Sequence, residues 1–323
     1  MKLEPNSKHG MKINTMPMVS VIITCYNHRH FVSEAIDSVL RQTYSHREII
    51  VVDDGSTDQT SEVVEQYSEV RYLRQRNQGV CAARNRGMQN SHGQYIVFLD
   101  GDDRLLPQHL EVSLAAFRSH PEVGWVCGEF RYFGTAEPIW QHDHRHHRCE
   151  RFPDLFGALL RGNCVGPPIV VMFSREVLFK VGGFDEHFKS ASCEDWDIYL
   201  RLSREIPLYC HHQLVAEHRL TDQQASRRWY VMLEGDFYAL WSQWRFIRGH
   251  PSYEEAYYQR ISLSRAGYGE RALWQMVADA RSGQWARAVK AFEVLLRCYP
   301  SGLLNLFKGK LTRVFFIRKV GSS

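Results

Sequence analysis

Between residues 18 and 100, short β-branched runs alternate with segments of helical period, and no other feature restricts the fold as much. The β-branched runs are apolar almost throughout, which is typical of strands buried on both faces of a sheet. The alternating segments cover residues 18–26, 31–43, 47–55, 57–67, 70–75, 79–90 and 94–100. Strands that alternate with helices of this length predict right-handed crossovers and a mostly parallel α/β sheet.

The remainder of the chain divides into two further regions. Residues 108–225 mix a helix at 108–120 with short strands and loops, and after about residue 226 the pattern is wholly helical. We therefore expect a disordered tail at 1–17, one α/β domain at 18–226 and an α-helical C-terminal region at 227–323.

Composition restricts the class of protein. With 44% apolar and 24% charged residues the chain is typical of an ordinary globular protein, and its net charge of +4 gives no reason to expect a nucleic-acid partner. Its eight cysteines are scattered without a C-x-x-C pair, which favours reduced thiols. The first residues lack the apolar core of a signal peptide, and no apolar run reaches 18 residues. We expect a cytoplasmic protein.

Two acidic clusters follow two of the predicted strands. Asp53 and Asp54 end one strand, and Asp100, Asp102 and Asp103 end another. In a parallel α/β sheet ligands bind beyond the carboxyl ends of the strands, so both clusters are expected at one binding edge. Mg²⁺ or Mn²⁺ commonly joins one or two such carboxylates to substrate phosphates.

Two other interpretations of the D-x-D remain open at this point. Asp and Gly favour turns, so "DGDD" could be a surface turn. A buried strand that ends in D-x-D also describes the haloacid-dehalogenase phosphatases. Their pattern has Thr or Val two places after the second Asp, near the start of the domain. Here Arg104 occupies that place, and three strands precede it.

Four ordered motifs carry a resemblance to a known family. They are "VSVIITCYNHRHFVSEAIDSVLRQTYSHREIIVVDDGSTDQT", "NQGVCAARNRGMQNSHGQYIVFLDGDD", "VGGFDEHF" and "EDWDIYLR". Over about residues 18–226 the chain resembles the family 2 glycosyltransferases of the GT-A fold. The resemblance implies a Rossmann-like sheet flanked by helices, a divalent metal, and an inverting transfer of sugar from a nucleotide-sugar to an acceptor hydroxyl.

The resemblance also implies roles for residues on the donor side. Thr24 and Tyr26 match the end of the first strand, where the family packs the nucleotide base. Asp54 resembles the carboxylate that accepts a hydrogen bond from the base, with Asp53 beside it. Asp53 could equally cap or brace the next turn.

Further donor-side positions follow along the chain. Asn77, Gly79 and Arg84 match the N-x-G-x-x-x-x-R stretch that lines the nucleotide pocket. Asp100 resembles the aspartate on the ribose side, and Asp102 resembles the metal ligand.

The catalytic base is expected in "EDWD". An inverting transfer needs one carboxylate to take the proton of the acceptor hydroxyl, and the motif implies Asp195, with Glu194 second. Helix capping is the structural alternative, since acidic residues favour a helix N-terminus. Many members carry a later histidine near the metal, but Thr221 stands at that place, so His218 or His212 could compensate.

The predicted function is therefore an inverting, Mn²⁺- or Mg²⁺-dependent glycosyltransferase of surface polysaccharide or glycan synthesis. A UDP-sugar is the favoured donor, and a saccharide or lipid-linked saccharide is the expected acceptor. Two alternatives are kept. A sugar nucleotidyltransferase should carry a Gly-rich loop after the first strand, where "CYNHRH" has no glycine. A non-catalytic nucleotide- or glycan-binding relative should have lost the site carboxylates.

Two further segments permit a binding interpretation. Residues 142–149, "HDHRHHRC", could bind zinc, but such a run is typical of an exposed loop. The C-terminal "KGKLTRVFFIRKV" alternates basic and apolar residues, which is typical either of a peripheral contact on the inner face of the membrane or of a last element packed on the domain.

Overall fold

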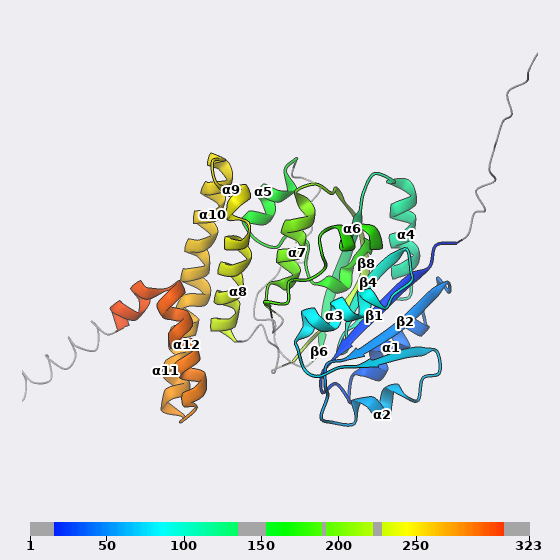
Figure 1. Ribbon diagram of the computed structural model, residues 1–323, viewed down its shortest axis with the longest axis horizontal. Helices are drawn as coiled ribbons and strands as arrows, with labels where there is room; N and C mark the ends of the chain where they lie inside the picture. Colours follow the sequence, from blue (N-terminus) through cyan, green and yellow to red (C-terminus); the bar gives the residue numbers. More distant parts are fainter. Residues whose placement is uncertain (1–15, 135–152, 189–191, 222–227, 307–323) are drawn as a thin grey trace, which may run out of the picture.

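The computed structural model describes residues 16–134, 153–188, 192–221 and 228–306 (Figure 1). Its centre is an eight-stranded sheet with the strand order β3-β2-β1-β4-β7-β6-β8-β5. The strands are β1 (Val19–Cys25), β2 (Arg47–Asp53), β3 (Val70–Arg74), β4 (Tyr95–Asp100), β5 (Arg104–Leu105), β6 (Trp125–Gly134), β7 (Val171–Ser174) and β8 (Leu208–Leu220).

The first half of the sheet confirms the predicted alternation. All seven residues of β1 are buried, and β1 runs parallel to β2 on one side and to β4 on the other. The connecting helices are α1 (Val32–Leu40), α2 (Thr60–Val64) and α3 (Val80–Gln89). In this register Cys25 lies opposite Asp53 and Thr24 lies opposite Asp100. Both acidic strand ends therefore flank β1 at the same edge.

The second half makes the sheet mixed. Among the described strands four pairings are parallel, whereas β4–β7, β6–β7 and β5–β8 are antiparallel. Apart from β4, the strands of these antiparallel pairs come after residue 100, where the strand–helix alternation that predicted parallel crossovers stops. The helices of this half are α4 (His109–Ser119), α5 (Leu155–Leu160), α6 (Arg175–Lys180) and α7 (Glu194–Ser203), with a 3₁₀ turn at Pro168–Val170.

The C-terminal region is helical, as predicted. It contains α8 (Trp229–Ser242), α9 (Trp244–Ile247), α10 (Pro251–Ser264), a π-helical segment (Arg265–Gly269), α11 (Glu270–Arg281) and α12 (Trp285–Cys298). Residues of α8, α9 and α10 belong to the same apolar core as the sheet. Helices α11 and α12 instead form a hairpin with a second, smaller core against α8. In Figure 1 this hairpin lies on the side of α8 away from the sheet.

Three predicted features lie outside the described residues: most of the N-terminal tail, the histidine-rich run at 142–149 and the basic C-terminal segment from residue 307. None of the helices in the described part of the chain combines the length and the apolar composition that a bilayer crossing requires.

Candidate active site

The site is built around the carboxyl end of β1. Thr24, the last residue of β1 to pair with β4, donates from its hydroxyl to Asp100 Oδ1 at 3.1 Å. Asp100 ends β4, and Asp53 ends β2 on the other side of β1. The two predicted acidic clusters are thus held in register by one ladder of parallel backbone hydrogen bonds.

Asp54 shapes the loop that enters α3. Its carboxylate accepts from the backbone N–H groups of Gln78 and Gly79 at 2.9 and 2.8 Å, and from the Gln75 side chain at 2.8 Å. Gly79 has φ +96°, a conformation that residues with a Cβ rarely adopt. Asn77 in this loop and Tyr26 after β1 are both exposed, Tyr26 by 45%. The residues predicted for the nucleotide base therefore surround an open part of the edge.

Asp53 supports the turn that follows β2. It is fully buried, and it accepts from Ser56 N at 2.8 Å and from the Tyr72 hydroxyl at 2.6 Å. A carboxylate with these partners stabilises the turn after β2, which agrees with the structural alternative for this residue. That Asp53 contributes to nucleotide binding stays a prediction.

Arg84 joins the donor-side and base-side carboxylates. Its guanidinium, 1% exposed, lies 2.9 and 3.2 Å from the two oxygens of Asp100 and 2.8 Å from Glu194 Oε1. Burial would raise the pKa of Asp100, but the Arg84 charge holds it below its usual value. The predicted nucleotide-pocket arginine is therefore an internal cation in this structure, tying β4 to α7.

The D-x-D turn after β4 is compact. A Cβ at Gly101 would lie 2.7 Å from His28 Nδ1 and 2.9 Å from Cys25 Cβ, so only glycine fits without movement. Asp102 is half-buried, and none of the described residues forms a salt bridge with its carboxylate. Burial and the charges of Asp103 and Asp100 raise the pKa of Asp102 to about 7.

The third aspartate of the turn, Asp103, is paired from β8. His218 Nδ1 donates to Asp103 Oδ2 at 2.9 Å, and the backbone N–H of Arg219 donates to Oδ1 at 2.7 Å. Burial would lower the pKa of His218, but the neighbouring carboxylates, Asp103 first, outweigh it and raise the pKa to about 9. Of the two histidines that could replace the family's histidine, His218 is the one at the acidic edge, since His212 lies beside Glu129.

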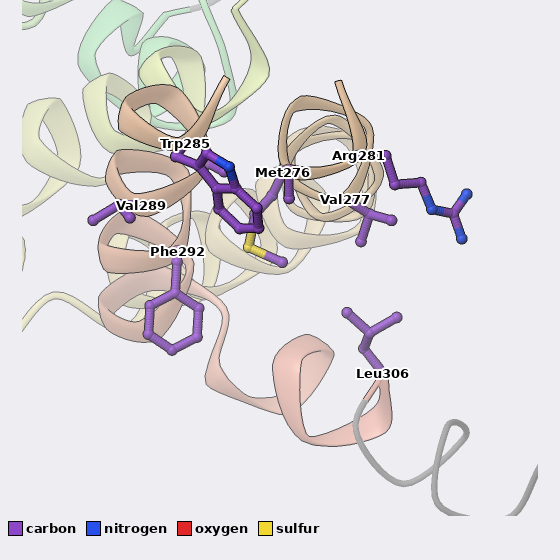
Figure 2. Close-up of a pocket in the computed structure, with 9 residues that line it drawn as sticks. Met276, Val277, Arg281, Trp285, Val289, Phe292 and Leu306 are labelled. Atoms are coloured by element: carbon purple, nitrogen blue, oxygen red, sulfur yellow. The ribbon is translucent and has the colours of Figure 1, made fainter. Parts of the chain in front are cut away.

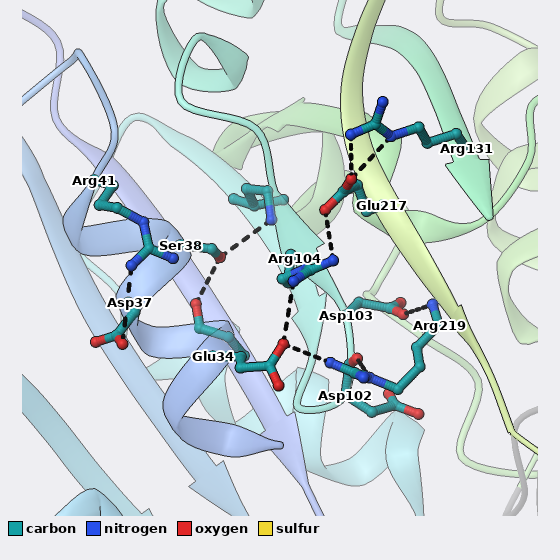
Figure 3. Close-up of polar contacts among 12 residues, drawn as sticks. Glu34, Asp37, Ser38, Arg41, Asp102, Asp103, Arg104, Arg131, Glu217 and Arg219 are labelled. Atoms are coloured by element: carbon teal, nitrogen blue, oxygen red, sulfur yellow. Dashed lines mark hydrogen bonds and ion pairs between the residues drawn. The ribbon is translucent and has the colours of Figure 1, made fainter. Parts of the chain in front are cut away.

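A charged network fixes this turn from outside (Figure 3). Arg219 Nε donates to the backbone oxygen of Asp102 at 2.7 Å, and its Nη2 donates to Glu34 at 2.7 Å. Arg104 reaches the same Glu34 carboxylate at 3.3 Å and Glu217 at 3.0 Å. Both guanidinium groups also stack on the Phe133 ring, at 3.9 and 4.3 Å from its centroid. Side chains of α1, β5 and β8 thus hold the peptide of Asp102.

The two acidic residues at the start of α7 have different environments. Both Glu194 oxygens already have partners inside the protein. Oε1 accepts from Arg84 at 2.8 Å, and Oε2 accepts from the backbone N–H of Ser192 at 2.6 Å. Asp195 Oδ2 accepts from the Asn163 side chain at 3.0 Å. Burial and the charge of Glu194 raise the pKa of Asp195 to about 7. A carboxyl group with a pKa near neutrality is suited to general-base catalysis.

The residues present fit a divalent cation held jointly with a substrate. No group of three or more His, Cys, Asp and Glu side chains in the described ranges forms a closed metal site. Mg²⁺ and Mn²⁺ commonly use one or two carboxylates and complete their coordination with phosphate oxygens and water. Asp102 offers such a carboxylate, unpaired with any described cation and with a pKa raised by like charges.

This geometry agrees with sequence comparison. The family described as "Glycosyl transferase family 2" matches residues 20–187, a range that contains the whole acidic edge of β1, β2 and β4. An uncharacterized glycosyltransferase of Rickettsia typhi is 32% identical over 239 residues, which cover 72% of this chain and 73% of that protein. The chain belongs to glycosyltransferase family 2.

Other relatives of this family 2 glycosyltransferase match over shorter stretches. One is TuaG of Bacillus subtilis, a glycosyltransferase named for teichuronic acid biosynthesis, which is 39% identical over 107 residues. These residues cover 31% of this chain and 42% of TuaG. The family therefore includes relatives named for polysaccharide biosynthesis.

Solved structures share the GT-A fold of the family 2 glycosyltransferase. S. aureus TarS in complex with UDP matches with a TM-score of 0.56 at 18% identity, over 80% of this chain and 78% of TarS. The mannosyltransferase PcManGT from Pyrobaculum calidifontis, in complex with GDP-Man and Mn²⁺, matches with a TM-score of 0.55 at 14% identity, over 90% and 88% of the two chains. At these identities the match establishes the fold.

Sequence reasoning missed two groups that complete the site. Asn163 holds Asp195 from 32 residues away, and its only local signal is the "GNCVG" turn, in which Asn163 Oδ1 accepts from Val165 N and Gly166 N. Arg219 holds Asp102 through its backbone oxygen. Neither contact follows from periodicity, because both depend on the packing of distant segments.

Proposed function

We propose that this family 2 glycosyltransferase transfers a sugar, with inversion, from a nucleotide-sugar to an acceptor hydroxyl, and that a UDP-sugar is its donor. The observation that carries the proposal is the buried Arg84, which brings the end of β4 and the start of α7 into one site. In our proposal residues 18–226 form the catalytic domain and residues 227–323 form the helical region.

On the donor side the residues bind and orient the nucleotide. Tyr26, Asn77 and Gly79 surround the base, with Thr24 and Asp53 behind them, and Asp54 fixes the loop that carries Asn77. Asp100, held ionised by Arg84, accepts from ribose hydroxyls. A divalent cation, Mn²⁺ or Mg²⁺, when bound at Asp102, would neutralise the negative charge of the leaving diphosphate.

On the acceptor side Asp195 removes the proton of the attacking hydroxyl. Its raised pKa leaves a substantial fraction ionised at neutral pH while keeping it a stronger base than an ordinary aspartate. Asn163 orients the carboxylate. Glu194 is the second candidate, but its two oxygens already accept from Arg84 and Ser192.

The deciding experiment measures thermal stabilisation by UDP, GDP and dTDP, each with and without Mn²⁺, on wild type and Asp102→Asn. A ligand at 100 times its Kd should stabilise the fold by about 2.7 kcal/mol. We expect a shift for one nucleotide that requires Mn²⁺ and disappears in Asp102→Asn. Asp37→Asn, at a part-exposed aspartate on α1, is the matched control and should keep the shift.

The outcome also separates the alternatives. Absence of a shift with every nucleotide would contradict the proposal. A shift without release of nucleotide from any sugar donor, over a broad donor and acceptor panel, would favour a non-catalytic binding protein instead.

The acceptor is proposed to be a growing surface polysaccharide, as a saccharide or lipid-linked saccharide. Support for this acceptor comes from the name of TuaG. The neighbours whose structures were solved with UDP, UDP-GlcNAc and GDP-Man support a nucleotide-sugar donor. A cytoplasmic location is proposed with it.

Peripheral membrane contact through the C-terminus completes the proposal. Residues 270–323 contain ten Lys and Arg against three Asp and Glu, whereas the whole chain has a net charge of only +4. Helix α12 exposes Trp285, Val289 and Leu296 along one face, by 65%, 55% and 57%. Figure 2 shows Trp285 and Val289 of this face lining the apolar groove of the hairpin, with Arg281 at its rim. Apolar and basic groups together are suited to an anionic lipid surface.

Liposome flotation tests this contact. We expect wild type to float with phosphatidylglycerol vesicles but not with phosphatidylcholine vesicles. The double variant Trp285→Ser/Leu296→Ser and a chain that ends at residue 306 should both float less. Equal flotation of all three proteins would exclude this surface as the membrane contact.

A further inference from the structure

A second cleft, of about 510 Å³, lies between α5, the loop after α5 and the start of α10. Its polar lining consists of Asp154, Arg161, Asn163, Ser252 and Tyr253. Its floor includes small residues of α5 and the following loop, so the space between the polar groups is open. No residue predicted from the sequence for the donor site lines this cleft.

One wall of the cleft is the side chain that holds the proposed base. Asn163 Nδ2 donates to Asp195 Oδ2 at 3.0 Å, while its Oδ1 accepts from the backbone of Val165 at 3.0 Å and Gly166 at 3.1 Å. The amide is therefore fixed on both sides. A group bound against Asn163 in the cleft lies one side chain away from the Asp195 carboxylate.

The opposite wall comes from the helical region. The Tyr253 ring on α10 is half-buried and packs edge-to-face on Phe156 of α5, with centroids 5.3 Å apart. A Cβ at Gly157 would lie 3.1 Å from Asp154 Cγ and 3.2 Å from Tyr253 Cε1, so the two side chains meet at this glycine. Burial and the Asp154 carboxylate raise the pKa of the Tyr253 hydroxyl. Asp154 also caps α5 by accepting from Gly157 N at 3.0 Å. The wall thus combines a fixed aromatic ring with a fixed carboxylate.

We infer that this cleft binds the terminal sugar ring of a saccharide acceptor, and this inference rests on the proposed function. A pyranose has an apolar C–H face and a rim of hydroxyl groups. Tyr253 offers an aromatic surface for the face. Asp154 accepts from hydroxyls, since a carboxylate has about four acceptor positions, and Arg161 donates to them.

The position of the cleft has a consequence for specificity. Arg161 uses one guanidinium nitrogen on the backbone oxygen of Gly157, at 3.1 Å, and keeps further N–H donors for a ligand. Tyr253 and Ser252 belong to α10, which the sequence assigned to the helical region rather than to the catalytic domain. Acceptor choice is therefore set partly by the helical region.

The first test variant fills the cleft without replacing its polar groups, and the second removes its aromatic wall. Ala158 lines the cleft from α5, and Ala158→Leu keeps a good helix former while occupying the space. Ala115→Leu, at an exposed position of α4, is the matched control, and Tyr253→Ala removes the aromatic wall. The probes are p-nitrophenyl glycosides of glucose, galactose, N-acetylglucosamine, mannose, rhamnose and glucuronic acid. Their stimulation of nucleotide release from the sugar donor that the wild type uses is measured.

We expect at least one glycoside to stimulate the wild type and the Ala115→Leu control. Ala158→Leu and Tyr253→Ala should raise the KM for that glycoside about tenfold or more. Release of nucleotide without acceptor, and stabilisation by nucleotide with Mn²⁺, should stay within about twofold of wild type.

Each contrary result is distinguishable. Unchanged stimulation of both cleft variants would overturn the cleft as acceptor site and leave the proposed function standing. Lack of stimulation by every glycoside, with nucleotide release intact, would overturn the assignment of a single sugar ring. Absence of nucleotide binding and release in the wild type would overturn the proposed function and this inference together.

Discussion

Arg84 is buried between two carboxylates, so its removal affects both of them. Arg84→Met would leave the buried Glu194 and the part-exposed Asp100 as neighbouring negative charges without a counter-ion. Breaking a buried ion pair from one side costs about 3–5 kcal/mol. We expect Arg84→Met to lower the free energy of unfolding, measured in urea, by this amount.

The exposed pair Arg41–Asp37 provides the control for this measurement. Arg41→Met should cost no more than about 1 kcal/mol, because solvent screens exposed ion pairs. The double variant Arg84→Met/Glu194→Gln should recover part of the loss. A cost for Arg84→Met as small as that of Arg41→Met would mean that the buried cation contributes little.

The pKa of Asp195 predicts how the rate depends on pH. Burial and the charge of Glu194 raise this pKa to about 7, and the base must be ionised to accept a proton. At saturating Mn²⁺, kcat/KM should rise through about pH 7 and fall about tenfold for each unit below it. Asp195→Asn should lose about 10²–10⁴-fold above pH 7, and its own profile should lack this rising limb.

Replacement of Asn163 should shift the pH profile of kcat/KM. Its N–H donates to the carboxylate and thereby favours the ionised form, so Asn163→Ala should raise the pKa of Asp195 and shift the rising limb to higher pH. The measurement is the pH profile of kcat/KM for both proteins. Coincident limbs would show that Asn163 does not act on the base.

At the scale of elements, the turn after β4 depends on the absence of a side chain at Gly101. Gly101→Ala places a Cβ 2.7 Å from His28 and 2.9 Å from Cys25, and overpacking of this kind typically costs about 1–3 kcal/mol. We expect a protein that folds but loses its Mn²⁺-dependent shift with nucleotide. Gly267→Ala meets open space in the helical region and should keep it. A retained shift in Gly101→Ala would mean that the turn tolerates displacement.

The elements also show which parts of the fold can be predicted from the sequence and which cannot. The strands and helices up to β4 were predictable because each has its own periodicity, and the acidic edge followed from parallel register alone. The sequence did not predict the pairing of β6 with β8 or the position of α10 against α5. These contacts join residues 80 to 100 positions apart that share no local pattern. In the site, the motif favoured Asp195 over Glu194 as the base, and this stays a prediction. The contacts of Glu194 with Arg84 and Ser192, which support it, could be seen only in the fold.

At the scale of the whole molecule, two cores of unequal size predict unequal local stability. The sheet and α8 to α10 share the large core, whereas α11 and α12 have their own small core against α8. Elements with few buried apolar contacts open more readily. Native-state hydrogen exchange should therefore be faster by orders of magnitude in α11 and α12 than in β1 and β4. Equal protection in the two regions would mean that they unfold as one unit.

The shared cation also has a consequence for how the family diverges. Arg84, Asp100 and Glu194 lie on three separate elements, and one cation serves two carboxylates. Loss of one carboxylate leaves Arg84 paired with the other, whereas loss of Arg84 leaves two negative charges without a counter-ion. A lineage that replaces the arginine should therefore also carry a neutral residue at one or both of the carboxylate positions, and a descendant that lacks the arginine alone should be rare.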